Sequence, residues 1–319
     1  MRRYVIKRLA QAVGVLWAAY TVSFLVLDYL PGDPVSAMAG AGMDSGEVDP
    51  ARLAALRHEY GFDRPVLVQY ADHLGRAVRG DFGDSISTGR PVTSTLTDAL
   101  PQTLQLTSAA LLLAVLLGDG IAVAATYTAQ RWLRQFLLSL PPLGVSVPTF
   151  WVGLLLVEVF SFRLRWFPAF GNDGLKGLVL PALTLAVPTG AQVAQVLAKS
   201  LLTALDQAYV ETARAKGASR WRVHLRHALR NASLPALTVV GLLVGQLIAG
   251  SVVVETVFSR DGLGRVTAAA VTSQDIPLVQ GVVVLGALIF VATSLVVDLV
   301  YPLLDPRIVV ASDRRASFA

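Results

Sequence analysis

The 319-residue sequence contains no cysteine, which excludes disulfide scaffolds, thiolate zinc sites, iron–sulfur clusters and cysteine nucleophiles. Charged residues make up only 15% of the chain, whereas an average soluble domain is about a quarter charged. Lysine is rare, and none of the lysines follows a glycine (Lys7, Lys176, Lys199 and Lys216). A P-loop needs Gly-Lys-Ser/Thr to hold phosphates, so the chain cannot hydrolyse ATP through such a loop.

Apolar residues dominate instead, at 54% of the chain, with a mean hydropathy of +0.58. Several apolar runs are long enough to cross a bilayer core of about 30 Å at about 1.5 Å per helical residue. We therefore expect an all-α polytopic membrane protein with about six transmembrane helices. The runs cover residues 9–30, 103–127, 135–162, 178–202, 234–257 and 280–304.

The runs divide the chain into four parts. Residues 1–30 are expected to form a cytoplasmic N-terminus and an uncleaved first transmembrane helix, and residues 31–100 an extracytoplasmic insert. Residues 101–305 hold the five-helix core, including a cytoplasmic loop at 203–232 between the fourth and fifth helices, and residues 306–319 form a cytoplasmic tail. The segments expected on the same side of the membrane as the N-terminus carry 16 of the 27 Lys and Arg residues. Six of the other 11 lie in the long insert, and charges in long loops have little influence on orientation.

The densest basic segment between two apolar runs covers residues 199–231. Gly217 can adopt a positive φ and end a helix, and Ser219 is suited to cap the next one. Arg222, Arg226 and Arg230 follow at spacings of four, which places them on one helix face. The segment therefore predicts two short helices about a glycine corner.

Three interpretations of this segment compete. It could be a solvated basic loop that follows the positive-inside rule, a helix-turn-helix that reads DNA, or a docking surface for a cytoplasmic protein. Tethering between two membrane spans would hold a recognition helix against the bilayer, which argues against DNA. We favour the docking surface and expect no nucleic-acid partner.

Glu211-Thr212-Ala213, followed by Gly217, resembles the EAA loop of bacterial ABC importer permeases, with Thr212 in place of an alanine. Further motifs, in order along nearly the whole chain, resemble the dipeptide/oligopeptide (peptide/nickel) branch and the first of its two homologous permease subunits. They are Leu-Pro-Gly-Asp-Pro at 30–34, Tyr-Gly-Phe-Asp-Arg-Pro at 60–65, Gly-Asp-Phe-Gly-Asp-Ser at 80–85, Arg-His-Ala-Leu-Arg-Asn at 226–231, Val-Glu-Thr-Val-Phe at 254–258 and Leu-Asp-Pro-Arg at 304–307.

The resemblance implies a permease subunit in the bacterial inner membrane. Its partners would be a homologous second permease, one or two ATP-binding subunits, an extracytoplasmic substrate-binding protein and membrane lipid. ATP and Mg would bind the partner subunits, and this chain would hold no cofactor. The cargo would be di- or oligopeptides, with nickel or another small solute as the alternative. The residues implied to dock the ATPase are Glu211, Ala213, Arg214, Lys216, Gly217 and Arg222.

Polar residues within the expected spans are further candidates. Gln192, Gln195, Gln246 and Ser251 could line a pore, where small polar groups let a peptide backbone pass with few fixed bonds. Ionisable groups in a span are functional candidates by default, and these are Asp119, Glu158 and Asp298. Acids at the span boundaries, such as Glu255, are expected to be solvated.

Two other classes remain as alternatives. A secondary transporter would need an ion site built from acids deep in the spans, often with inverted repeats, and no repeat is evident. An intramembrane protease could use Asp119 and Asp298 as paired carboxylates, or Ser146 as a nucleophile. The histidines His58, His73, His224 and His227 all lie outside the expected spans, so Ser146 lacks a base, and Asp119 lacks the expected glycine context.

Overall fold

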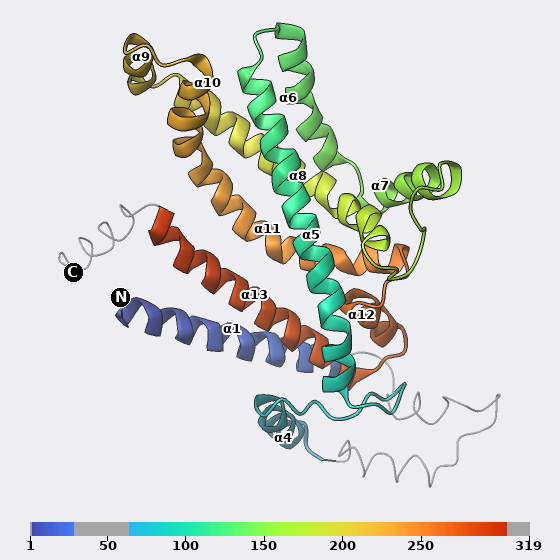
Figure 1. Ribbon diagram of the computed structural model, residues 1–319. Coiled ribbons are helices and arrows are strands. Elements are labelled where there is room, and N and C mark those ends of the chain that lie inside the picture. Colours follow the sequence, from blue (N-terminus) through green and yellow to red (C-terminus); the bar gives the residue numbers. More distant parts are fainter. Residues whose placement is uncertain (1, 29–63, 305–319) are drawn as a thin grey trace. The chain divides into compact units, whose positions relative to one another are not determined.

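The computed structural model describes residues 2–28 and 64–304, which are almost entirely helical apart from short loops and an isolated bridge between Asp84 and Pro91. The helices in order are α1 (Arg2–Asp28), α4 (Val66–Val78), α5 (Val92–Tyr127), α6 (Arg131–Ser146), α7 (Thr149–Leu156), the π-helix η1 (Val157–Arg163), α8 (Lys176–Leu205), α9 (Ala208–Ala215), α10 (Arg220–Arg222), the π-helix η2 (Val223–Ala228), α11 (Leu229–Val257), α12 (Leu263–Thr272) and α13 (Ile276–Leu304) (Figure 1).

Five helices in the described residues are long and apolar enough to cross a membrane, and a sixth span results if one bent helix pair is counted as a unit. The five helices are α1, α5, α8, the continuous α10–η2–α11 stretch and α13. The bent pair consists of α6 and the α7–η1 stretch. The prediction of an all-α polytopic protein with about six spans is confirmed.

The third expected span, at 135–162, is not one straight helix. Its two halves meet at Val147–Pro148 with a bend of 105°. Proline disfavours the helical conformation of the residue before it, and Val147 is accordingly extended, at φ −83° and ψ 129°. Pro141 and Pro142 lie inside α6 without breaking it. Only one of the three prolines therefore interrupts the helix, and the bent pair counted as a unit supplies the third expected span.

The described part of the expected insert contains α4 and a loop at 79–91. Helix α5 begins at Val92, so the proposed domain boundary at residue 101 falls inside a continuous helix that contains Pro101. The predictions for residues 31–63 and 306–319 lie outside the described residues. The domain boundaries stay predictions.

The chain divides into two compact units. The first contains residues 1–102 and 261–291, and the second contains residues 103–260 and 292–319. In the first unit, Tyr70 of α4 packs against Phe24 of α1 with ring centroids 5.4 Å apart, and its hydroxyl lies 2.8 Å from Thr21 Oγ1. The start of α5 packs on α12 and α13 through an apolar cluster. Its buried members are Val92, Leu96, Ala99, Leu263, Ala270 and Leu278.

In the second unit α8 is the central helix and packs most extensively against α11 and α6 (Figure 1). Its contact with α5 is built from small residues. A Cβ atom added at Gly118 would lie 2.7 Å from the carbonyl oxygen of Gly190, and one added at Gly190 would lie 2.8 Å from that of Ala114. Small residues allow membrane helices to approach closely, so the two backbones here are nearly in contact.

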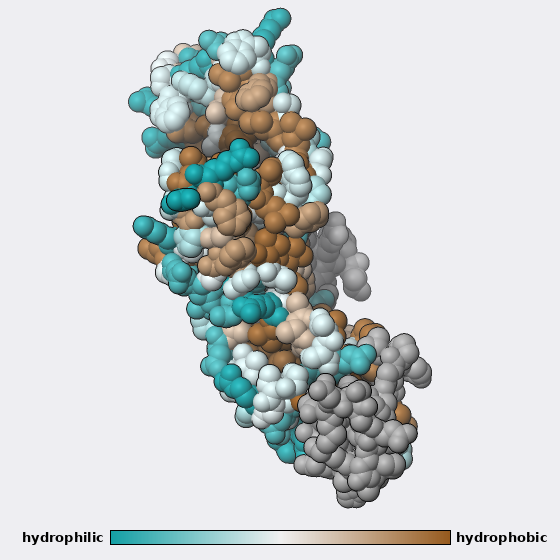
Figure 2. Space-filling model, turned by 90° about the vertical axis from the view of Figure 1, so that its right-hand side faces the viewer, coloured by the Kyte–Doolittle hydropathy of each residue, from teal (hydrophilic) through white to brown (hydrophobic). Residues whose placement is uncertain are grey.

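Large hydrophobic side chains are exposed on many of the membrane-length helices, and Figure 2 shows apolar residues over much of one face. Soluble monomers rarely expose such extensive apolar surface. This surface suits lipid or other membrane-embedded chains. Examples are Val13, Trp17, Leu112, Leu116, Trp132, Phe136, Leu154, Leu242 and Val296.

Candidate functional site

The 203–232 loop lies at one end of the second unit's helices, where Figure 1 shows α9 and α10 together. Helix α8 ends at Leu205, and α9 starts at Ala208 after a short break. Val210 is the one buried residue of α9, so nearly all of this helix is accessible. The loop therefore presents a short helix whose single anchor leaves its other faces available to a partner.

A glycine corner separates α9 from α10, as predicted. Gly217 has a φ of +80°, which only glycine adopts without strain. Its N–H donates to the Arg214 carbonyl at 2.9 Å, and the Ala218 N–H donates to the Ala213 carbonyl at 3.1 Å. Ser219 then caps α10, with its Oγ accepting from the N–H of Arg222 at 3.4 Å. The predicted glycine corner and serine cap are confirmed, but the predicted second short helix is wrong, because α10 continues through η2 and α11 as one helical stretch from Arg220 to Val257.

The residues predicted to dock an ATPase lie on this corner. Ala213 is half-buried, and the other five are exposed (Glu211, Arg214, Lys216, Gly217 and Arg222). In the described part of the chain, none of the four charged side chains among them forms an ion pair. The arrangement offers unpaired charges of both signs to a partner, and their docking role stays a prediction.

The second half of the loop contains a π-helix, η2, that packs a histidine against α5. The π-helix η2 buries His224, which has 3% of its surface exposed and lies 3.1 Å from Thr126 Oγ1 of α5. Arg226 and Arg230 remain exposed. A basic row alone does not reveal a π-helix, so this buried histidine could not be predicted from the residue pattern.

The exposed strip of α8 is entirely polar. Between Gly177 and Ala204 its only exposed residues are Gln195, Lys199 and Thr203, four residues apart. Gln192, one turn earlier, is half-buried. A lipid-facing strip would be apolar, so this side of the most buried membrane-length helix suits water, cargo or a polar partner.

Gln246 of α11, the helix that packs most extensively on α8, is also exposed. The two helices meet where Leu185 approaches Gly250, whose added Cβ would lie 3.2 Å from the leucine. Helix α8 leads into the 203–232 loop and α11 leads out of it. Gln192 comes after Leu185 in α8 and Gln246 comes before Gly250 in α11, so both glutamines lie between this contact and the loop. Ser251, by contrast, is buried and donates to the Ile248 carbonyl at 2.7 Å.

The three acids predicted in the spans have different surroundings. Glu158 is exposed and pairs with Arg163 at 3.0 Å. Asp119 is half-buried in α5, and no hydrogen bond or ion pair of its carboxylate is found among the described residues. Asp298 belongs to α13, but its side chain lies outside the described part. The roles of all three stay predictions.

Two buried polar residues of the second unit were missed. Glu255 is 0% exposed and accepts from Thr103 Oγ1 at 2.7 Å, which corrects the expectation that this boundary acid is solvated. Arg260 is 1% exposed and donates from Nη1 to the Gly177 carbonyl at 2.9 Å. Buried charges are functional or structural by necessity, since desolvation is costly. The signal in the sequence was the presence of Glu255 and Arg260, two charged residues five positions apart, at the end of an apolar run.

Asp275 anchors the 79–91 loop within the first unit. The carboxylate is 0% exposed and accepts from Ser85 Oγ at 2.6 Å and Ser87 Oγ at 2.8 Å. Its other oxygen accepts from the N–H of Leu278 at 3.2 Å, which caps α13. Burial alone raises the pKa of Asp275, but the hydrogen bonds from Ser85 and Ser87 outweigh it and lower the pKa.

Asp275→Asn is expected to destabilise the protein by about 2 kcal/mol at neutral pH, because an amide satisfies fewer of these donors. Because the folded-state pKa is lowered, the carboxylate contributes fully above the unfolded pKa of about 3.9 and loses its contribution as pH falls through the folded value. The gap in melting temperature between parent and variant should therefore narrow below about pH 4. Asp98→Asn, at an exposed ion pair with Arg90, is the control and should change stability by less than about 1 kcal/mol. A pH-independent gap would contradict the assignment.

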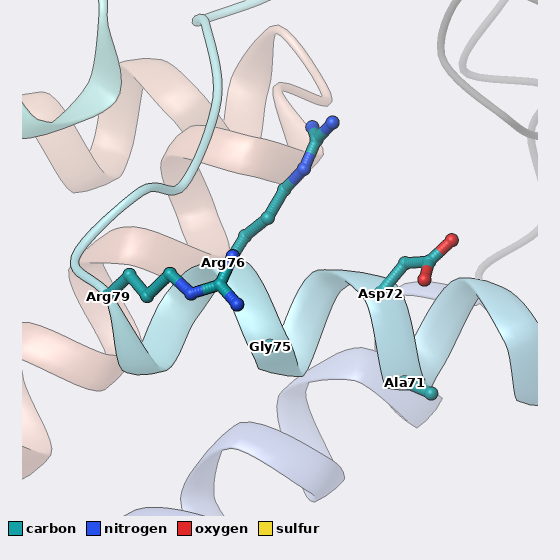
Figure 3. Close-up of a pocket in the computed structure, with 5 residues that line it drawn as sticks. All are labelled: Ala71, Asp72, Gly75, Arg76 and Arg79. Atoms are coloured by element: carbon teal, nitrogen blue, oxygen red, sulfur yellow. The ribbon is translucent and has the colours of Figure 1, made fainter.

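A shallow recess of about 340 Å³ runs along α4. Figure 3 shows that its labelled residues come from α4 and from Arg79 just beyond its end, with the side chains of Asp72, Arg76 and Arg79 pointing in different directions. A recess formed by a single exposed helix holds no converging groups. Among the described residues, no three His, Asp or Glu side chains converge as metal ligands either.

Comparison with family models gives two matches that together cover most of the chain. Residues 97–310 match the model described as "Binding-protein-dependent transport system inner membrane component". Residues 1–107 match the corresponding N-terminal model, "Binding-prot-dependent transport system membrane comp, N-term". The first match alone covers more than half of the sequence.

Full-length relatives agree with these matches. The glutathione transport system permease protein GsiC of Salmonella typhimurium is 38% identical over 97% of this chain and 99% of its own length. The protein of the same name from Escherichia coli K12 is 37% identical over the same shares. A solved structure described as inward-facing conformations of the MetNI methionine ABC transporter matches with a TM-score of 0.52, at 17% identity, over 66% of this chain and 95% of that one. This last likeness shows the shared fold.

Proposed function

Because the chain belongs to the family of binding-protein-dependent transport system inner membrane components, we propose that it forms half of the pore of an importer for di- and oligopeptides. The protein is a multi-pass permease subunit of an ABC importer and is not itself the ATPase, which is a separate subunit in this family. The observation that carries the peptide assignment is the 38% identity, over 97% of this chain, to a permease named for transport of glutathione, which is a tripeptide.

The proposed importer requires four kinds of partner. A homologous second permease forms the other half of the pore, and one or two ATP-binding subunits bind ATP and Mg. An extracytoplasmic binding protein delivers the peptide, and lipid covers the exposed apolar side chains. Both termini and the 203–232 loop face the cytoplasm. The excess of Lys and Arg on the N-terminal side supports this orientation.

The 203–232 loop is the coupling element. The accessible α9, the corner at Gly217 and the unpaired charges of Glu211, Arg214 and Lys216 supply a compact, polar projection that fits a cleft on an ATPase. Closure of two ATPases would push this projection and rock the helices attached to it, which is a transition between two states biased by nucleotide.

Gln192, Gln195 and Gln246 line the peptide path in this proposal. Amides both donate and accept hydrogen bonds, so they can replace water around a passing peptide backbone without binding it tightly. The wholly polar exposed strip of α8 supports this assignment. Ser251 keeps its hydroxyl on its own helix and adds less to the path.

Gln195→Leu is expected to slow peptide uptake about three- to tenfold, because one hydrogen bond contributes about 0.5–1.5 kcal/mol. Assembly with the ATPases should be unchanged. Gln195→Asn retains an amide and should transport nearly as well as the parent. Initial uptake rates in proteoliposomes measure the effect, and equal rates for the parent, Leu and Asn variants would remove Gln195 from the path.

Competition for uptake tests the cargo directly. Proteoliposomes containing the complete importer would take up a labelled dipeptide in the presence of unlabelled tripeptides, tetrapeptides, free amino acids and nickel. Competition by peptides alone supports the proposal. Competition by nickel or by free amino acids alone would overturn the peptide assignment while leaving the permease identity intact.

A further inference from the structure

Tyr127, the last residue of α5, is surrounded by side chains from the 203–232 loop. The guanidinium carbon of Arg220 lies 4.7 Å from the centre of its ring. The rings of Trp221 and His224 meet it edge to face, at centroid distances of 5.7 Å and 5.5 Å. Cation–π and edge-to-face contacts are attractive geometries for aromatic rings. Three residues within five positions of the loop therefore converge on one ring.

Hydrogen bonds reinforce this contact. The Arg220 guanidinium donates to the backbone carbonyl of Tyr127. Thr126 Oγ1 donates to the Ala122 carbonyl at 2.7 Å, so its contact with His224 Nε2 at 3.1 Å has the histidine as donor. Both residues at the end of α5 are thus tied to the loop by directional bonds as well as by ring contacts.

An apolar cluster continues the contact along the helices. Ala122 of α5 packs with Ala228 and Ala232, which follow His224 along the chain. His224 lies within η2, and π-helical turns occur frequently at functional positions. Helices α8 and α11 are joined covalently to the loop, whereas the end of α5 meets the loop non-covalently and α5 packs on α8 farther along its length.

We infer that Tyr127 is a positioning residue that fixes the end of α5 to the 203–232 loop, so that both move as one body when ATPases displace the loop. The inference rests on the proposed function, since it requires that ATP drives the loop. Its physical basis is that the end of α5 meets the loop through non-covalent contacts alone, and Tyr127 takes part in those with Arg220, Trp221 and His224. Without the ring, the loop would move while α5 lagged behind.

Replacing the ring tests the inference by the amount of peptide transported per ATP hydrolysed. Tyr127→Leu removes the contacts with Arg220, Trp221 and His224, and we expect peptide transported per ATP to fall about fivefold or more. Tyr127→Phe retains the ring and is the matched control, expected to behave as the parent. Trp132→Leu removes an exposed aromatic side chain elsewhere in the second unit and should have no effect.

Spin labels report the motion itself, and the absence of native cysteine makes the labelling simple. Ala129→Cys lies beyond the end of α5 and Ala215→Cys at the end of α9, both at exposed positions. The distance between the labels should be the same in the resting and nucleotide-trapped complexes. In the Tyr127→Leu background, nucleotide trapping should change it.

Two results would overturn the inference. One is a label distance that changes on nucleotide trapping while Tyr127 is present, a measurement that does not depend on any variant folding. The other is equal transport per ATP for the Leu and Phe variants. If instead the parent complex shows no ATP-dependent uptake at all, the proposed function fails, and this is seen before any variant is made.

Discussion

Adding a single methyl group at Gly118 is expected to lower the stability of the protein by about 2–3 kcal/mol. The new Cβ would lie 2.7 Å from the Gly190 carbonyl oxygen and 2.8 Å from Val193 Cβ. A backbone carbonyl cannot rotate aside as a flexible side chain can. Helices α5 and α8 would therefore have to separate along their small-residue contact, and the packing of both sides would suffer.

Gly120→Ala is the matched control, because it lies on the same helix and a Cβ there meets nothing within 4 Å. It should change stability by less than about 1 kcal/mol, with a slight gain from helix propensity. The melting temperature of the purified complex measures both effects. Equal melting temperatures for Gly118→Ala and Gly120→Ala would show that α5 and α8 are not in close contact.

Gly217→Pro is expected to lower peptide-stimulated ATP hydrolysis more than tenfold, or by at least about 1.4 kcal/mol, while the complex still assembles. Proline fixes φ near −65°, whereas Gly217 has a φ of +80°. Proline also removes the N–H that donates to the Arg214 carbonyl. The corner between α9 and α10 would open, and the loop would no longer fit its partner rigidly.

Gly217→Asn is the control for this prediction, because asparagine tolerates a positive φ better than other side chains. It should retain most of the stimulation. Hydrolysis would be measured with and without the loaded binding protein, and co-purification of the ATPases would show assembly. Full stimulation in Gly217→Pro would mean that the corner plays no part in coupling.

Local chemistry made much of the 203–232 loop predictable. A glycine with no Cβ and a serine two residues later identify a helix end and a helix start, and both were found at Gly217 and Ser219. The membrane helices were equally predictable, because their length and apolar content are local properties. The exact place of the bend at Val147–Pro148 was not, since Pro141 and Pro142 stay within α6 and only Pro148 interrupts the helix.

Burial of polar groups depends on contacts with distant parts of the chain, so it could not be predicted from the sequence. The carboxylate of Glu255 is satisfied by Thr103, 152 residues away, and that of Asp275 by Ser85, 190 residues away. The aromatic contact between Tyr127 and His224 has the same origin. The glutamines were chosen from the sequence as pore candidates, and this role stays a prediction. That Gln195, Lys199 and Thr203 form one exposed strip of α8 is known only from the burial of its other residues.

ATP-driven import is tested by peptide uptake into proteoliposomes that contain the permease pair and its ATPases, with ATP sealed on the side of the 203–232 loop. Peptide and binding protein are supplied on the other side, and ionophores collapse all ion gradients. We expect uptake to continue under these conditions and to stop when ATP is omitted. Uptake that needs no ATP and follows an ion gradient would contradict ATP-driven import and favour a secondary transporter.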